Sequence, residues 1–390
     1  MTLTRRSLLQ LGLGGMLLFP LRPVAGYPSR ATRFDAWRRE FEAGMPSLMR
    51  AAKVPGSAVA ITAPGAHHYT AAFGMADIHQ GRRLTATTPM HLASVSKLAT
   101  ALALVQLFER KGHDLHEGLD RYLDFPVRNP RYPKQIITPH HLLTHTSSIS
   151  DEGYGDLTHP GDSPQKLSDF LSGYLVEGGN TWSRDGSFLP HPPGASWSYS
   201  NVGMALAGHV VEAVSGQSFA SYVQANVFTP LGIEGAHWSI AAFGRDVLAT
   251  PYVVEANAFT PLPQQGYPDV PAGMLRCSVH QLATLLNAML PGMASTRAIA
   301  SDEALARMLR SQVDPAIAPY QGLGWVSEDV GARQVIGHSG SDPGASNMVA
   351  LSDDRRHAVV VLMNVDGSRR SARFRDRVTH DLLGGAALLD

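Results

Sequence analysis

A serine and a lysine stand three positions apart at the head of a long apolar stretch of this chain. Ser94 and Lys97 precede residues 98–107, in which only Thr100 and Gln106 are polar. Positions i and i+3 of a helix share a face, so the two side chains would point into the same space. A helix that is apolar on nearly every side is a buried one. The stretch therefore predicts a central helix that carries a hydroxyl and an amine at its head.

This pair has two interpretations. A desolvated Lys97 loses its proton more easily and could act as a base toward Ser94, which is the arrangement of an activated nucleophile. Alternatively, Lys97 extends to the surface and Ser94 caps the helix. A second Ser-x-x-Lys, from Ser163 to Lys166, lies in a Gly-, Pro- and Asp-rich loop without an apolar helix behind it, and we assign it no role.

Composition describes a globular protein with no bias toward polyanions. The 390 residues are 44% hydrophobic and 17% charged, and the formal net charge is zero. Such a chain can bury a large core as one big domain or two, and nucleic-acid binding is not expected. The single cysteine, Cys277, cannot form an intrachain disulfide.

The first 26 residues resemble a twin-arginine export signal. Arg5 and Arg6 precede an apolar run over residues 8–21, and the small residues Ala25 and Gly26 follow it. The run is short for a membrane span. We expect an exported protein, periplasmic or secreted, with no stable membrane span after signal removal. An ordinary secretory signal or an uncleaved anchor are the alternatives.

The periodicity of the remaining chain predicts an α+β fold. Strands are predicted near both ends and helices between them, which implies one antiparallel sheet built from both chain ends with a mainly helical lobe inserted. The predicted strands are 57–63, 68–73, 322–326, 334–338, 347–351 and 358–363. The predicted helices are 31–49, 98–110, 166–175, 202–214, 218–228, 278–290, 302–309 and 371–383.

We place the boundaries of the two lobes from this pattern. One domain covers residues 27–390, with a sheet lobe at about 30–115 and 265–390 and a helical lobe at about 116–264. A cleft should lie between them. Residues 150–195 form a connection long enough to be a lid or a wall of a site.

Two further stretches combine polar groups with an element boundary. Tyr199 and Asn201 are two positions apart just before a predicted helix, so a phenol and an amide would face one cavity. An N-cap at Asn201 and a core aromatic at Tyr199 are the alternative. Further on, Gly340 follows His338 beside a predicted strand, where glycine allows close approach of a ligand to the backbone. An ordinary edge strand with a bend is the alternative there.

The spacing of His141 and His145 is the i, i+4 spacing that zinc ligands on a helix use. The residue after His141 is Leu142, whereas a zinc protease needs a glutamate there. We therefore interpret the pair as packed histidines of a structural helix, and we expect no metal and no cofactor.

Taken together, these motifs resemble the serine β-lactamase and penicillin-binding protein superfamily, in particular the branch of class C β-lactamases, D-alanyl carboxypeptidases and family VIII esterases. Ser94-x-x-Lys97, Tyr199-x-Asn201 and His338-Ser339-Gly340 occur in that family's order, and the resemblance extends from about residue 35 to the end. Other stretches resemble landmarks of the family: Pro55 to Ala60, Gly74 to Asp77, Leu142 to Ser147, Tyr199 to Met204 and Pro230 to Ile233.

The resemblance implies a role for each matching position. Ser94 would attack a carbonyl and form an acyl-enzyme, Lys97 would accept the Ser94 proton, and Tyr199 would assist toward the leaving group. Asn201 would hydrogen-bond Lys97 and the substrate. The backbone N–H groups of Ser94 and Ser341 would hold the oxyanion, a function worth ~10²–10³-fold for each donor.

His338 departs from the pattern, because β-lactamases and carboxypeptidases usually have lysine at this position. An imidazole with an ordinary pKa of about 6.5 would replace a fixed cation that grips a substrate carboxylate. A secreted carboxylesterase or amidase acting on a small ester, amide or peptide is therefore expected, and weak β-lactam turnover is compatible with that activity. A β-lactamase, a D-alanyl-D-alanine carboxypeptidase and a non-catalytic penicillin-recognising protein remain alternatives, and the oligomeric state stays open.

Overall fold

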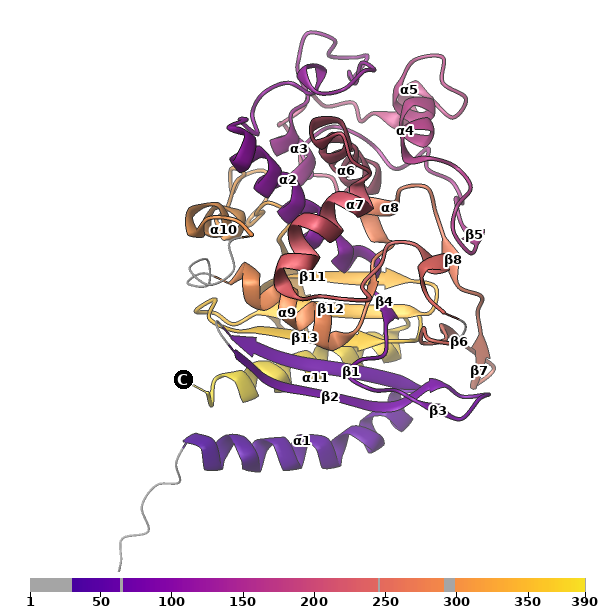
Figure 1. Ribbon diagram of the computed structural model, residues 1–390, viewed down its shortest axis with the longest axis vertical. Helices are drawn as coiled ribbons and strands as arrows, with labels where there is room; N and C mark the ends of the chain where they lie inside the picture. The colour runs from indigo at the N-terminus through magenta and orange to yellow at the C-terminus, as the bar shows by residue number, and fades with distance from the viewer. Residues whose placement is uncertain (1–29, 64–65, 245, 291–298, 390) are drawn as a thin grey trace, which may run out of the picture.

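The computed structural model describes residues 30–63, 66–244, 246–290 and 299–389. The predicted export signal, residues 1–26, lies outside the described residues. The sequence folds as predicted into an α+β structure around one seven-stranded antiparallel sheet (Figure 1).

The large sheet joins the two ends of the chain. Its strand order is β10-β11-β12-β13-β1-β2-β3, so the N-terminal strand β1 pairs with the C-terminal strand β13. The strands are β1 (Gly56–Ala63), β2 (Ala66–Asp77), β3 (Arg82–Arg83), β10 (Val326–Val330), β11 (Arg333–Asp342), β12 (Ala345–Leu351) and β13 (Ala358–Met363).

Six shorter strands pair outside this sheet. They are β4 (Met90–His91) with β9 (Arg276–Cys277), β5 (His159–Pro160) with β8 (Gln265–Gly266), and β6 (Tyr252–Glu255) with β7 (Ala258–Pro261). The β4–β9 pair matters for the site, because β4 leads directly into the segment that carries Ser94.

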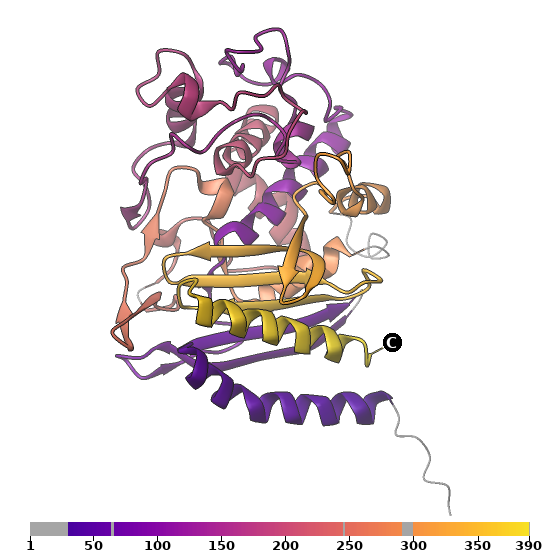
Figure 2. The same ribbon diagram turned by 180° about the vertical axis from the view of Figure 1, so that it is seen from behind.

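Helices cover both faces of the sheet, and the two layers differ in depth (Figures 1 and 2). Of the helices that the structure describes, α1 (Arg30–Ala52) and α11 (Arg369–Ala386), one at each end, lie on one face. The other face carries a deep helical region. Its helices are α2 (Lys97–Lys111), α3 (Pro139–Leu143), α4 (Leu167–Leu175), α5 (Arg184–Ser187), α6 (Asn201–Ser215), α7 (Phe219–Val223), α8 (Val270–Gly273), α9 (Val279–Met289) and α10 (Asp302–Leu309).

A hydrophobic core lies on each face of the sheet. The larger core extends without interruption from sheet residues such as Leu362 through α2 to α6, where Leu206 is fully buried. The smaller core lies beneath α1 and α11 and contains Phe41, Met45 and Phe374. Successive side chains of a β-strand point to opposite faces of the sheet, so the same strands contribute apolar side chains to both cores.

Several predicted boundaries were wrong. Residues 322–325 form a turn, with Gly324 at φ +76°, and the strand predicted at 322–326 begins only at Val326. The helix predicted at 218–228 stops at Val223 and continues as a π-helical turn over Gln224–Phe228. β11 continues past the predicted end at 338 as far as Asp342.

Candidate active site

Ser94 lies in a strained turn in front of α2. It belongs to a 3-10 turn, Ala93–Ser96, rather than to the α-helix itself. Ala93 has φ +50°, a conformation that costs a non-glycine residue energy and that clusters at functional sites. The turn is held in place because the Leu275 N–H donates to the Ser96 hydroxyl at 3.1 Å. Ser94 itself stays partly exposed.

Lys97 is completely buried and donates to three oxygens. Its Nζ lies 3.1 Å from Ser94 Oγ, 2.7 Å from Asn201 Oδ1 and 2.7 Å from the Ala272 carbonyl oxygen. Burial lowers the pKa of Lys97 from 10.5 to about 8. Three carboxylates limit this fall in pKa: Asp269, Asp151 and Asp342. The surface interpretation of Lys97 is therefore wrong.

Tyr199 stands over Lys97 with its hydroxyl buried. The Lys97 amine lies 4.8 Å from the centre of the phenol ring, and the rings of His145 and His338 lie 4.5 and 6.1 Å from it. Burial raises the pKa of Tyr199, and the neighbouring Ser94 hydroxyl opposes that rise. The phenol oxygen has no well-formed hydrogen bond to any described residue.

Asn201 is held by the start of α6, where Ser200 is the N-cap. The Asp151 carboxylate accepts hydrogen bonds from the Ser200 hydroxyl at 2.8 Å and from the N–H groups of Asn201 and Val202 at 2.5 and 3.2 Å. A carboxylate is favoured at a helix N-terminus by the backbone dipoles. Asp151 thus positions the amide that contacts Lys97.

β11 passes Ser94 with part of its edge unpaired. β10 pairs with β11 only as far as Gly337, so residues 338–342 have β12 on one side alone. The Ser339 N–H points to the open side, where it donates to Glu328 at 2.7 Å. N–H groups two residues apart point the same way along a strand. The Ser341 N–H therefore faces the open edge as well.

Gly340 lets this edge close onto the Ser94 turn. A Cβ at this position would lie 2.4 Å from the Leu92 carbonyl oxygen and 3.2 Å from the Val95 nitrogen. The sequence predicted a close approach by a ligand, whereas the structure places the protein's own Ser94 turn there.

His338 is buried, and its pKa is not near 6.5. Burial lowers the pKa to about 3, and the charge of Lys97 acts in the same direction. Nδ1 lies 2.6 Å from the Ser339 carbonyl oxygen, so Nδ1 carries the proton and donates it. Nε2 is buried without a partner among the described residues and offers a lone pair. The side chain is therefore a neutral acceptor rather than a titrating cation.

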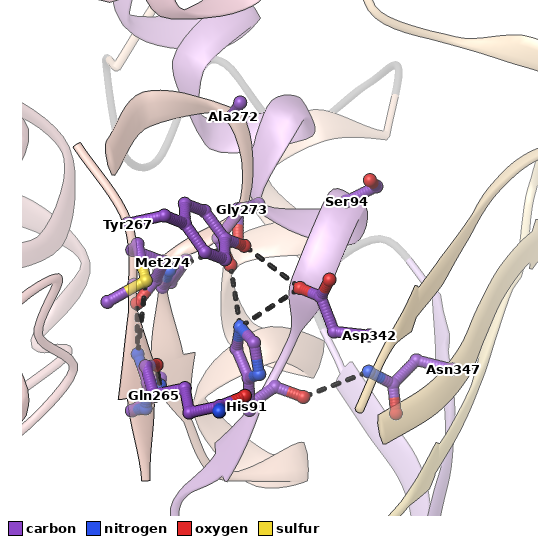
Figure 3. A network of polar contacts seen from close by, with 12 residues as sticks. His91, Ser94, Gln265, Tyr267, Ala272, Gly273, Met274, Asp342 and Asn347 are labelled. Carbon is purple, nitrogen blue, oxygen red and sulfur yellow. Dashed lines mark hydrogen bonds and ion pairs between the residues drawn. The ribbon is translucent and has the colours of Figure 1, made fainter. Parts of the chain in front are cut away.

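A buried group of polar side chains extends from the site toward β4 and β9, and Figure 3 shows its part around His91, Tyr267 and Asp342. Tyr267 donates to the Asp342 carboxylate at 2.9 Å, and His91 lies 3.5 Å from the same oxygen. Beside them Tyr154 donates to Asp269. Burial raises the pKa of both carboxyl groups.

Sequence reasoning missed four residues around this site. Asp151, Asp269 and Asp342 carried no motif of their own. His145 was interpreted as a packed histidine, although it belongs to a landmark stretch of the resemblance. His145 accepts from the Ser200 N–H at 3.2 Å. It lies beyond the end of α3 at Leu143, so the two histidines considered for zinc do not share a helix.

The described residues contain no group of three or more His, Cys, Asp or Glu side chains placed to hold a metal ion. None of the described helices is long and apolar enough to cross a membrane.

Comparison with known proteins identifies relatives along most of the chain. A family model described as Beta-lactamase matches residues 41–383. Penicillin-binding protein 4* of Bacillus subtilis (strain 168) is 25% identical over 312 residues, which is 76% of this chain and 65% of that protein. Esterase EstB of Burkholderia gladioli is 32% identical over 210 residues, 52% of each chain.

A solved structure has a similar architecture. The octameric penicillin-binding protein homologue from Pyrococcus abyssi is 25% identical, with a TM-score of 0.70 over 89% of this chain and 77% of that chain. This chain spans between about half and two thirds of the length of the two curated relatives.

Proposed function

Because this chain belongs to the β-lactamase family, we propose that it is a serine hydrolase that forms an acyl-enzyme on Ser94. One observation carries the proposal: a fully buried amine with a lowered pKa lies 3.1 Å from a partly exposed hydroxyl. With a pKa of about 8, part of the amine population is neutral near physiological pH, and this neutral form can accept the hydroxyl proton. Such general-base catalysis is worth ~10²–10⁴-fold.

In the proposed acylation step, Lys97 Nζ takes the Ser94 proton while Oγ attacks the substrate carbonyl carbon. The carbonyl oxygen becomes an oxyanion held by the N–H groups of Ser94 and Ser341. The intermediate collapses when the bond to the leaving group breaks, and the Tyr199 hydroxyl gives that group a proton. Asn201 keeps the Lys97 amine aligned throughout.

In the proposed second step, water attacks the acyl carbon and Ser94 leaves as its alcohol. The Tyr199 phenolate left by the first step accepts a proton from that water, and the protonated Lys97 returns its proton to Ser94 Oγ as the acyl–oxygen bond breaks. Lys97 and Tyr199 thereby return to their starting protonation states, and no cofactor takes part.

We propose small carboxylic esters or amides as substrates. His338 is neutral, so it cannot balance a substrate carboxylate as a lysine would. The carboxylates around Lys97 add negative charge, which disfavours a second anion in the same cleft. Uncharged acyl groups suit these surroundings better than the free carboxylate of a β-lactam or a D-alanyl peptide.

A β-lactamase or D-alanyl-D-alanine carboxypeptidase is the second candidate. The match to a penicillin-binding protein of Bacillus subtilis favours it. Hydrolysis of nitrocefin or release of D-alanine faster than hydrolysis of p-nitrophenyl butyrate would make it the better assignment.

We also propose export, on the strength of the paired arginines and the apolar run that follows them.

Covalent labelling tests the nucleophile and separates catalysis from mere binding. A fluorophosphonate should add to the Ser94 peptide in the purified protein, as read by mass spectrometry, and p-nitrophenyl butyrate should be hydrolysed. Ser94→Ala should abolish both. Ser163→Ala, in the second Ser-x-x-Lys, is the matched control and should leave both unchanged. Labelling elsewhere, or full activity in Ser94→Ala, contradicts the proposal.

A further inference from the structure

The zero net charge of this chain conceals a strong separation of charge. Helices α1 and α11, with Lys53 after α1, contain eleven Lys and Arg residues and five Asp and Glu residues. The rest of the described chain contains seventeen Lys and Arg and twenty-seven Asp and Glu. One part of the molecule therefore carries an excess of six positive charges and the other an excess of ten negative charges.

The positive part forms a single layer on one face of the sheet. Figures 1 and 2 show α1 and α11 on the face opposite α2, α6 and α9. Their apolar sides point into the sheet through residues such as Met45 and Val378. Their basic side chains face solvent, and we call these residues the basic layer. The exposed members are Arg30, Arg33, Arg38, Arg39, Arg50, Arg369, Arg370, Arg373 and Arg377.

The start of α11 is the strongest part of the basic layer. Arg369, Arg370 and Arg373 occupy the first turns of the helix, where backbone dipoles already produce positive potential and cations are disfavoured. None of the three has a carboxylate within ion-pair distance among the described residues. A cluster that breaks a local rule without compensation in the fold is a candidate for an external anion.

These arginines border a groove that also has apolar walls. The groove has a volume of about 660 Å³ and lies between the end of α1 and the start of α11. Lys53 and the three arginines line it together with Leu48, Val254 and Phe374. Cations beside apolar side chains match an amphiphilic anion, which has a charged head and an apolar remainder.

We propose that the basic layer docks on the anionic headgroups of a phospholipid bilayer. The dimensions favour a surface over a small anion. Helices of 23 and 18 residues are about 35 and 27 Å long at ~1.5 Å per residue, and exposed arginines occur at both ends of α1. Juxtaposed basic residues of this kind are what anionic lipid attracts.

Docking in this orientation leaves the Ser94 turn free. The Ser94 turn contacts β11 and β12 from the face of the sheet opposite α1 and α11. The same anionic surface repels the acidic remainder of the molecule, so electrostatics alone selects the orientation. The inference does not depend on the proposed hydrolase activity.

Vesicle co-sedimentation of the full chain tests the proposal. We expect at least about tenfold tighter binding to vesicles of phosphatidylcholine with ~30% phosphatidylglycerol than to pure phosphatidylcholine. Raising the salt concentration from ~0.05 M to ~0.5 M should abolish this preference for anionic vesicles, because salt screens the charges over a shorter distance. Equal binding to both vesicles, or binding that resists salt, would overturn the proposal and indicate apolar insertion by another segment.

Charge variants locate the contact. The triple variant Arg369→Gln, Arg370→Gln, Arg373→Gln should weaken binding at least about fivefold. The matched control Lys111→Gln, Lys134→Gln, Lys166→Gln removes the same charge from exposed positions outside the basic layer and should bind like the wild type. An unchanged thermal unfolding midpoint verifies folding in each. The proposal is overturned if both triple variants lose vesicle binding equally or if the arginine triple variant binds like the wild type. It is also overturned if the protein binds heparin but not vesicles.

Discussion

At the scale of single residues, the site depends on Lys97 being buried without an adjacent carboxylate. Its nearest partners are the hydroxyl of Ser94, the amide of Asn201 and a backbone carbonyl, none of which carries a charge. Carboxylates act on it only from further away. A neutral amine keeps two N–H donors for Asn201 and Ala272, and its lone pair can then accept the Ser94 O–H. The desolvation that lowers the pKa of Lys97 is therefore only partly offset.

This pKa predicts the pH dependence of hydrolysis. Only the neutral Lys97 can accept the Ser94 proton, so kcat/KM for p-nitrophenyl butyrate should rise with pH and level off above about 8. Lys97→Met should lower kcat/KM by ~10²–10⁴-fold and remove this limb of the profile. If the rise of kcat/KM with pH persists unchanged in Lys97→Met, a group other than Lys97 is responsible for it.

The lowered pKa of Lys97 also predicts how the folding stability changes with pH. The pKa of Lys97 is 10.5 in the unfolded chain and about 8 in the folded one. Between these values the unfolded state binds the extra proton, so stability rises with pH across this window and is lost as pH falls through 8. Lys97→Met should flatten this part of the stability curve, as measured by urea denaturation at several pH values.

The neutrality of His338 predicts a preference among acyl groups. The wild type should hydrolyse p-nitrophenyl butyrate at least about tenfold more efficiently than its carboxylate analogue mono-p-nitrophenyl succinate, since a charged hydrogen bond is worth ~1.5–3 kcal/mol. His338→Lys should narrow this gap by a similar factor. The rise of activity with pH, which depends on Lys97, should also move to lower pH, because a second cation nearby lowers the pKa of Lys97. A preference that is identical in both proteins would exclude His338 from substrate selection.

At the scale of elements, the site requires the close contact of β11 with the Ser94 turn. The open edge of residues 338–342 exists because β10 pairs only as far as Gly337. Gly340 then allows the strand to lie against the Leu92 carbonyl. Both features bring the Ser341 N–H beside the Ser94 turn, where an oxyanion donor has to be placed within a few tenths of an ångström.

Gly340→Ala should separate the two elements. The added Cβ would lie 2.4 Å from a backbone oxygen that cannot rotate away, so the strand has to move. We expect a loss of ~10²–10³-fold in kcat, as for removal of one oxyanion donor. Gly384→Ala in α11 is the matched control, because nothing lies within 4 Å of its Cβ. That variant should keep full activity and gain up to about 1 kcal/mol of stability. Wild-type kcat in Gly340→Ala would contradict the model of the site.

At the scale of the whole molecule, the large core joins the sheet and the helical region. Leu362 of β13 and Leu206 of α6 belong to the same continuous cluster, although they stand on opposite sides of the predicted cleft. A core shared in this way couples the two regions, because neither can expose its side without exposing the other. The lobe boundaries at residues 116 and 264 remain a prediction about domains.

We therefore expect one cooperative unfolding transition. Thermal unfolding followed by tryptophan fluorescence and by far-ultraviolet circular dichroism should give the same midpoint. Leu206→Ala and Leu362→Ala should each lower that single midpoint, with losses of ~2–5 kcal/mol for a buried leucine. Two separated transitions, each sensitive to only one of the variants, would show that the lobes unfold independently.

What could be predicted from the sequence was local or short in range. The apolar stretch after Lys97 predicted a buried helix, and the alternation near both chain ends predicted strands of one sheet, because periodicity reports which faces are buried. The order of Ser94, Lys97, Tyr199, Asn201 and Gly340 indicated one site through a resemblance, before any distance was known. The turn at residues 322–325 was missed since a left-handed glycine leaves no trace in hydrophobic periodicity.

Only the tertiary structure decided the electrostatics. Asp151, Asp269 and Asp342 are ordinary acids in the sequence, and they act on Lys97 because three separate segments meet around one buried amine. The pKa of His338 likewise depends on burial that its neighbours in the chain do not provide. The same holds for the basic layer, which arises from two helices at opposite ends of the chain. Charge interactions depend on distance and solvent exposure, and neither is a property of the order of residues.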